Sequence, residues 1–141
     1  MYDSKGKLVK GFDFDKLSSE ILQAPKHIRL NNKDYILVPE ASGKLNILSR
    51  QGKSRIDVKE DIDFSATPWF QYKNNFISIS SKGKLVTINE QGNVSDVAVG
   101  ENGNVKLSAN NNLLVTMADN TLKIGDQVIN LDYGLYTSPQ I

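Results

Sequence analysis

The chain has 141 residues, 39% of them hydrophobic and 23% charged, with a formal net charge of +1 and no cysteine. This composition is typical of one folded domain, and it excludes a disordered chain, a strongly charged nucleic-acid coat, disulfides and thiolate chemistry. No run approaches the ~18 apolar residues of a membrane span, and the first dozen residues lack the apolar core of a signal peptide. We therefore expect a soluble chain with no nucleic-acid partner and no membrane insertion. The cellular compartment stays open, and the chain is compatible with a longer parent protein that is exported.

The first stretch, residues 1–23, is expected to be the end of an incomplete structural unit. Its phrase YDSKGKLVKGF places Gly6 as Gly52 and Gly92 are placed in two later phrases. The sequence DKLSSEIL at residues 15–22 then fits one helical turn capped by its aspartate. We expect at most this one short helix.

An eleven-residue phrase follows twice, forty positions apart. GKLNILSRQGK begins at Gly43 and GKLVTINEQGN begins at Gly83, and a proline, Pro25 or Pro68, opens the stretch upstream of each. A more divergent third copy comes after them. The expected units are residues 24–66, 67–103 and 104–135. Repeats of about 40 residues indicate a solenoid, a propeller or another array.

Each copy has the rhythm of β-strands. Short runs rich in β-branched residues are bounded by Asn or Gly every seven to twelve positions. Glycine in SRQGKS and NEQGNV supplies the positive φ that a short hairpin needs, and Gly125-Asp126 suits a two-residue hairpin. Each copy therefore resolves into four antiparallel strands. In the second copy these are expected near residues 69–73, 76–80, 84–89 and 94–99.

Four strands in a repeat of about 40 residues resemble a blade of the β-propellers, the group that includes WD40, kelch and quinoprotein-type repeats. The Trp-Asp and Gly-His signatures of WD40 repeats are absent, so no family's binding residues carry over. The resemblance implies a single all-β, β-propeller-like domain over residues 1–141, with three four-stranded blades and partial blades at residues 1–23 and 136–141. The alternative is a plain antiparallel barrel or sandwich with accidental self-similarity.

Recognisable catalytic chemistry is scarce. His27 is the only histidine, which argues against a Ser-His-Asp set and favours a partly buried, hydrogen-bonded imidazole. The acids of residues 13–15 and 60–63 lack the central glycine of a calcium loop, and the glycines of residues 100–104 lack the context of a phosphate loop. No metal or other cofactor is expected.

Two classes of function remain. The first is a non-catalytic binding or scaffold module that presents its loops to a protein or glycan partner. The alternative is a fragment of a propeller glycoside hydrolase or lyase with acids on the connections between blades. We name as the loop face the connections at residues 59–67 and 99–103 with the turns at residues 39–43, 80–83 and 118–120.

Candidate contact residues on the loop face are Glu40, Asp61, Asp63 and Trp69. For Trp69, packing between neighbouring sheets is the competing interpretation. Three blades would also leave raw sheet edges, which invite pairing with another chain. We therefore expect the chain to self-associate through these edges as a homo-oligomer.

Overall fold

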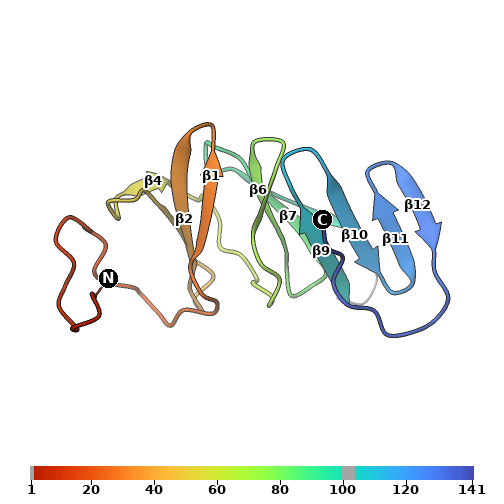
Figure 1. The fold of residues 1–141 in the computed structure, drawn as a ribbon, viewed down its shortest axis with the longest axis horizontal. Helices are drawn as coiled ribbons and strands as arrows, with labels where there is room; N and C mark the ends of the chain where they lie inside the picture. Colours follow the sequence, from red (N-terminus) through yellow and green to blue (C-terminus); the bar gives the residue numbers. More distant parts are fainter. Residues whose placement is uncertain (1, 100–103) are drawn as a thin grey trace.

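The computed structural model describes residues 2–99 and 104–141, and these residues form twelve strands and no helix (Figure 1). The strands make three open, four-stranded antiparallel sheets, each in chain order. Sheet 1 contains β1 (Lys26–Leu30), β2 (Lys33–Pro39), β3 (Leu45–Leu48) and β4 (Ser54–Ile56). Sheet 2 contains β5 (Phe70–Tyr72), β6 (Asn75–Ile79), β7 (Lys84–Ile88) and β8 (Val94–Ala98). Sheet 3 contains β9 (Val105–Ala109), β10 (Leu114–Ala118), β11 (Thr121–Ile124) and β12 (Gln127–Asn130).

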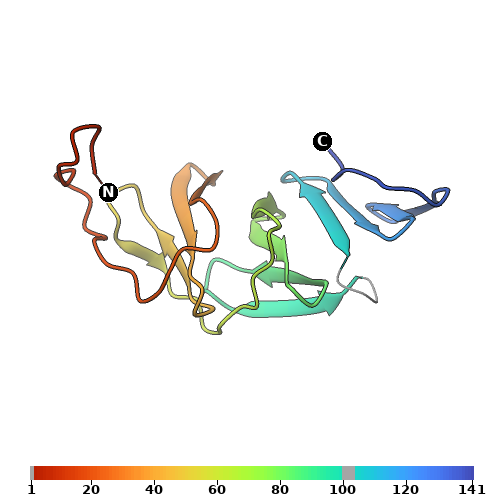
Figure 2. The same cartoon turned by 90° about the horizontal axis from the view of Figure 1, so that it is seen from below.

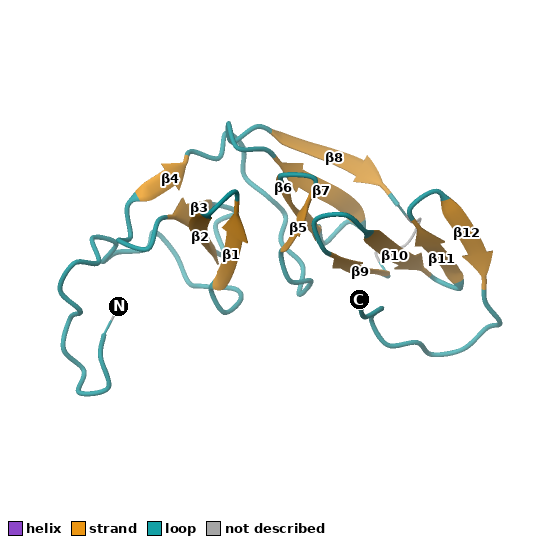
Figure 3. Cartoon of the chain, turned by 45° about the horizontal axis from the view of Figure 1, so that its top comes forward, coloured by secondary structure: helices purple, strands orange, loops and turns teal. Residues whose placement is uncertain are grey.

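The all-β prediction is confirmed, and so are three four-stranded antiparallel sheets. In sheet 2 every strand begins and ends within about two residues of the expected position. The sheets follow one another along an arc, with β1, β5 and β9 on the concave side and β4, β8 and β12 along the convex side (Figures 2 and 3).

One hydrogen-bond pattern recurs at three hairpins and explains why the chain turns there. The first residue's side-chain oxygen accepts the N–H groups two and four positions ahead, and its own N–H donates to the carbonyl four positions ahead. The three first residues are Asp3, Ser49 and Asn89. The residue three positions ahead is always glycine with a positive φ, namely Gly6 (72°), Gly52 (75°) and Gly92 (84°).

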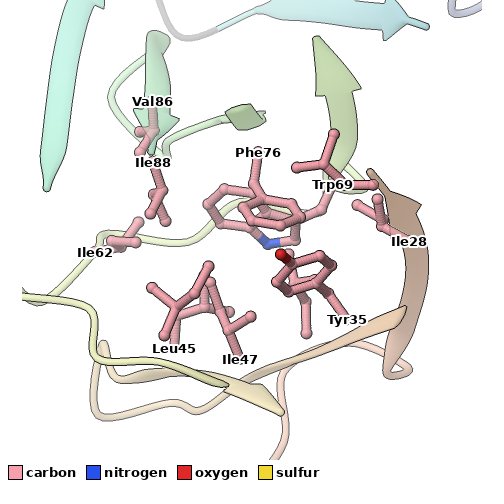
Figure 4. Close-up of a cluster of buried hydrophobic side chains, with 12 residues drawn as sticks. Ile28, Tyr35, Leu45, Ile47, Ile62, Trp69, Phe76, Val86 and Ile88 are labelled. Atoms are coloured by element: carbon pink, nitrogen blue, oxygen red, sulfur yellow. The ribbon is translucent and has the colours of Figure 1, made fainter. Parts of the chain in front are cut away.

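Two hydrophobic cores join the sheets. Between sheets 1 and 2, Trp69 and Phe76 are fully buried against Tyr35, whose ring meets that of Phe76 edge-on with 5.1 Å between centroids (Figure 4). The second core lies between sheets 2 and 3. Its buried members are Ile77, Ile79, Val105 and Leu107. Since alternate residues of a strand face opposite sides, sheet 2 supplies one face to each core.

The expected helical turn at residues 15–22 is wrong. Ser18 and Ser19 instead donate their backbone N–H and side-chain O–H groups to the carboxylate of Glu40, and Ile21 pairs with Glu40 in an isolated β-bridge. Bonds to a distant residue thus replace the local i to i+4 bonds that a helix would make. At the other end, residues 136–141 form no strand, and Lys106 Nζ donates to the Tyr136 carbonyl.

Candidate functional site

The connection from β4 to β5 is held between the turns of two different sheets. The N–H of Ile62 donates to the Gly43 carbonyl at 2.8 Å, in the β2–β3 turn of sheet 1. The N–H of Ser81, in the β6–β7 turn of sheet 2, donates to the Asp63 carbonyl at 2.9 Å. These bonds place residues 61–63 beside both turns, as expected for the loop face. In the other expected connection of the loop face, at residues 99–103, residues 100–103 lie outside the part of the chain that the structure describes.

Asp61 and Asp63 are exposed acids of this connection, as are Asp57 and Glu60 before them. The Asp63 carboxylate lies 2.9 Å from Lys82 Nζ, and this hydrogen bond and charge raise the pKa of Lys82 above its ordinary value. Cavities of about 200 and 260 Å³ flank the connection, and both are lined by Asp61 and Asp63. The first also contains the Lys84–Asp96 pair, with 3.0 Å between Nζ and Oδ2. The connection therefore offers charges of both signs on a fixed backbone.

Glu40 begins the β2–β3 turn but lies inside the molecule. It is 1% exposed, and its carboxylate accepts hydrogen bonds from Ser18, Ser19 and the Asn46 amide, the last at 2.5 Å. Burial acts to raise the pKa of Glu40, but the hydrogen bonds from Ser18, Asn46 and Ser19 outweigh it and hold the pKa below its ordinary value. Glu40 thus remains a carboxylate that anchors the N-terminal segment to the turn.

Trp69 also lies inside, in the core between sheets 1 and 2, where it is 1% exposed. Its ring packs edge-on against Phe64 with 6.3 Å between centroids. In the described part of the chain, Trp69 Nε1 is the buried side-chain polar atom that has no hydrogen-bond partner. Packing, the competing interpretation of this residue, therefore accounts for its position.

The four candidates thus separate into two pairs. Asp61 and Asp63 lie together on the exterior, whereas Glu40 and Trp69 present little surface to a ligand. The sequence did not point to Lys82, although its turn and the Asp63 connection were expected on one side of the molecule. The opposite charges of Asp63 and Lys82, on two segments expected on the same side, were the sequence signal that could have identified this pair.

His27 does not have the partial burial expected for it. Ile28 and Leu30 face the core shared with sheet 2, so the alternate residue His27 faces the opposite side of sheet 1, and its side chain is 60% exposed. Its Nε2 lies 2.7 Å from Asp34 Oδ1. Over the described residues, no group of three or more His, Asp or Glu side chains is arranged to hold a metal ion.

Comparison with protein-family models, with curated proteins and with solved structures finds no match for this chain. No helix in the described ranges is long and apolar enough to cross a membrane. Conclusions about function therefore rest on the geometry of the chain itself.

Proposed function

We propose that this chain is a non-catalytic, β-propeller-type binding or scaffold module that presents its loop face to a protein or glycan partner. The propeller-type arrangement is supported by three consecutive four-stranded sheets that follow an arc, with their first strands on the concave side (Figure 3). It is supported also by the hairpin pattern shared by Asp3, Ser49 and Asn89.

The observation that carries the binding role is the fixed position of residues 61–63. Backbone hydrogen bonds to Gly43 on one side and from Ser81 on the other hold the connection, while the Asp61 and Asp63 side chains stay exposed. A loop held in one conformation loses little entropy when a partner binds. Loops on a rigid scaffold are also where binding residues concentrate.

The acids are less suited to the alternative, glycoside cleavage. A glycosidase acid stays protonated inside an apolar enclosure. Asp63 is instead exposed and paired with Lys82, and Asp61 is exposed beside the Gly43 turn. Surface carboxylates of this kind suit hydrogen bonds to hydroxyl or amide groups of a partner.

The test compares three forms of the chain: wild type, the double variant Asp61→Asn/Asp63→Asn, and the control Asp126→Asn, which removes an exposed acid in the β11–β12 hairpin. Each is applied to an array of neutral and acidic glycans and to an array of peptides, with chromogenic glycosides as the activity assay. We expect a ligand retained by wild type and the control and bound at least about tenfold more weakly by the double variant, with no hydrolysis. Hydrolysis lost in the double variant would establish the enzyme alternative. Binding equal in all three forms would refute the loop face as the binding surface.

A further inference from the structure

The face of sheet 1 that points away from sheet 2 is only partly covered. Ile36, Val38 and Leu48 form its apolar centre, and the N-terminal segment of residues 2–25 passes over them. A cavity of about 390 Å³ remains between the two, lined also by Phe12 and Phe14. The corresponding face of sheet 2 is closed by sheet 1, which leaves Phe76 and Ile88 fully buried. We call the partly covered surface the outer face of sheet 1.

A row of charged residues borders this apolar centre. The strand register places His27 opposite Ile36, and the next pair on the same face of these strands is Arg29 opposite Asp34. Because every second residue of a strand points to the same side, His27, Arg29, Asp34 and Ile36 all belong to the outer face. We call His27, Arg29 and Asp34, together with Arg50 that lies next to Asp34, the basic row. The basic row lies directly beside Ile36 on the cavity floor.

The basic row has more positive than negative charge. Asp34 accepts a hydrogen bond from His27 at 2.7 Å and lies 3.7 Å from the Arg50 guanidinium. The hydrogen bond from His27, with the charges of Arg50 and Arg29, holds the pKa of Asp34 below its ordinary value. The Asp34 carboxylate is thus the one negative charge shared by Arg29, Arg50 and His27. The Arg50 side chain is still 73% exposed, which leaves its guanidinium open to a second carboxylate.

This charge is particular to the outer face of sheet 1. Arg29 and Asp34 form the second pair from the turn that joins the first two strands of sheet 1. In sheet 2 the pair at this position is Gln71 opposite Phe76, and neither residue carries a charge. Sheet 2 is closed there by apolar packing against sheet 1. A face with arginines at this position is not built to be closed by another sheet of the same kind.

The N-terminal segment indicates the chemistry that fits. In Phe12-Asp13-Phe14-Asp15, both phenylalanines line the cavity, and Asp13 Oδ2 lies 3.8 Å from Lys53 Nζ. The N–H of Asp13 also donates to the Gln51 carbonyl at 2.7 Å. An alternation of aromatic and acidic residues in an extended chain therefore already covers part of this face.

We propose that the outer face of sheet 1 is a docking surface for an extended acidic segment of a partner protein. A large apolar side chain of that segment enters the cavity above Ile36, Val38 and Leu48, and a carboxylate pairs with Arg50 and Arg29. This surface is separate from the loop face, so the two proposals stand or fall independently.

The probe is a fluorescein-labelled peptide with the sequence of residues 11–16, GFDFDK, and its match is the same peptide with both aspartates replaced by asparagine. Fluorescence polarisation follows binding to wild type, to Arg29→Gln/Arg50→Gln, and to the control Lys44→Gln/Lys123→Gln, which also loses two exposed positive charges. We expect the acidic peptide to bind wild type and the control alike, and the arginine variant at least about tenfold more weakly. The asparagine peptide should bind wild type about tenfold more weakly than the acidic peptide does. This comparison does not depend on whether the arginine variant folds.

Amide shifts in two-dimensional NMR locate the peptide, and perturbation is expected at Ile36, Val38 and Leu48. Equal affinity for the acidic and the asparagine peptide would overturn the proposal, as would binding that survives the loss of both arginines or no binding at all. Sedimentation of the free chain supplies a further test. A dimer that dissociates on Arg29→Gln/Arg50→Gln would show that a second copy, and not an acidic partner segment, occupies the face.

Discussion

Replacement of Gly92 by alanine tests how the connection before β5 packs against the β7–β8 hairpin. Gly92 has a φ of 84°, and a Cβ added there would lie 1.9 Å from the Asp57 carbonyl oxygen. The left-handed conformation costs a non-glycine residue about 1–2 kcal/mol, and crowding of a packed site adds about 1–3 kcal/mol. The backbone shift also threatens the 3.0 Å bond from the Lys59 N–H to the Gly92 carbonyl, a further ~1 kcal/mol. We expect Gly92→Ala to lower the free energy of unfolding by about 3–6 kcal/mol.

Gly125→Ala is the matched control, because Gly125 also has a positive φ, 57°, but no atom lies within 4 Å of an added Cβ. It should lose only the conformational cost of about 1–2 kcal/mol. Gly52→Ala should fall between the two, since its Cβ would lie 2.7 Å from the Phe14 nitrogen. Urea denaturation followed by circular dichroism measures all three. Equal losses for Gly92→Ala and Gly125→Ala would refute the packing of Asp57 on the hairpin.

Three further outcomes are expected. Because hydrogen bonds hold the pKa of Glu40 below its unfolded value, its carboxylate stabilises the fold fully above that value and loses the contribution as the pH falls through the lower folded value. Urea denaturation should therefore show Glu40→Gln about 2–4 kcal/mol less stable than wild type at pH 7, with the difference narrowing once the pH falls below the ordinary glutamate pKa of about 4.3, and a difference independent of pH would contradict this. Trp69→Ala should lower the free energy of unfolding by about 3–5 kcal/mol, and Trp69→Phe by only about 1–2 kcal/mol because phenylalanine keeps a large ring and removes the unpaired N–H. A Phe variant as unstable as the Ala variant would contradict this ordering. Sedimentation equilibrium should give a mass above 15.7 kDa, because β12 is an exposed edge strand without charged residues, and a monomer at high concentration would count against edge pairing.

Strand positions were predictable because the turns are specified locally. Glycine at residues 52 and 92 needs a positive φ, and Ser49 and Asn89 supply side-chain acceptors within four residues, so both hairpins can be read from adjacent letters. The segment at residues 15–22 was not predictable in this way. Its conformation depends on Glu40, whose carboxylate is about twenty positions away in the chain.

The candidate site was predictable only where exposure follows from loop position. Asp61 and Asp63 alternate with the apolar Ile62 and Phe64 in the connection, and both acids are exposed. Glu40 follows a strand at the start of a turn and looks equally exposed in sequence, but the two serines and Asn46 enclose it. The outer face of sheet 1 was missed for the same reason: Arg29 and Arg50 are 21 positions apart and meet only through Asp34.

Amide hydrogen exchange at Ile62 and Ser81 bears most directly on the proposed binding module, because the proposal requires a loop face held in one conformation. Ser81 is an exposed turn residue, yet its N–H is bonded to the Asp63 carbonyl at 2.9 Å, and that of Ile62 to the Gly43 carbonyl at 2.8 Å. Both amides should exchange at least about a hundredfold more slowly in NMR than the unbonded amides of an open loop. Exchange of both at the rate of an unstructured peptide would mean that residues 61–63 are not held between the two turns, and the proposed binding face would be contradicted.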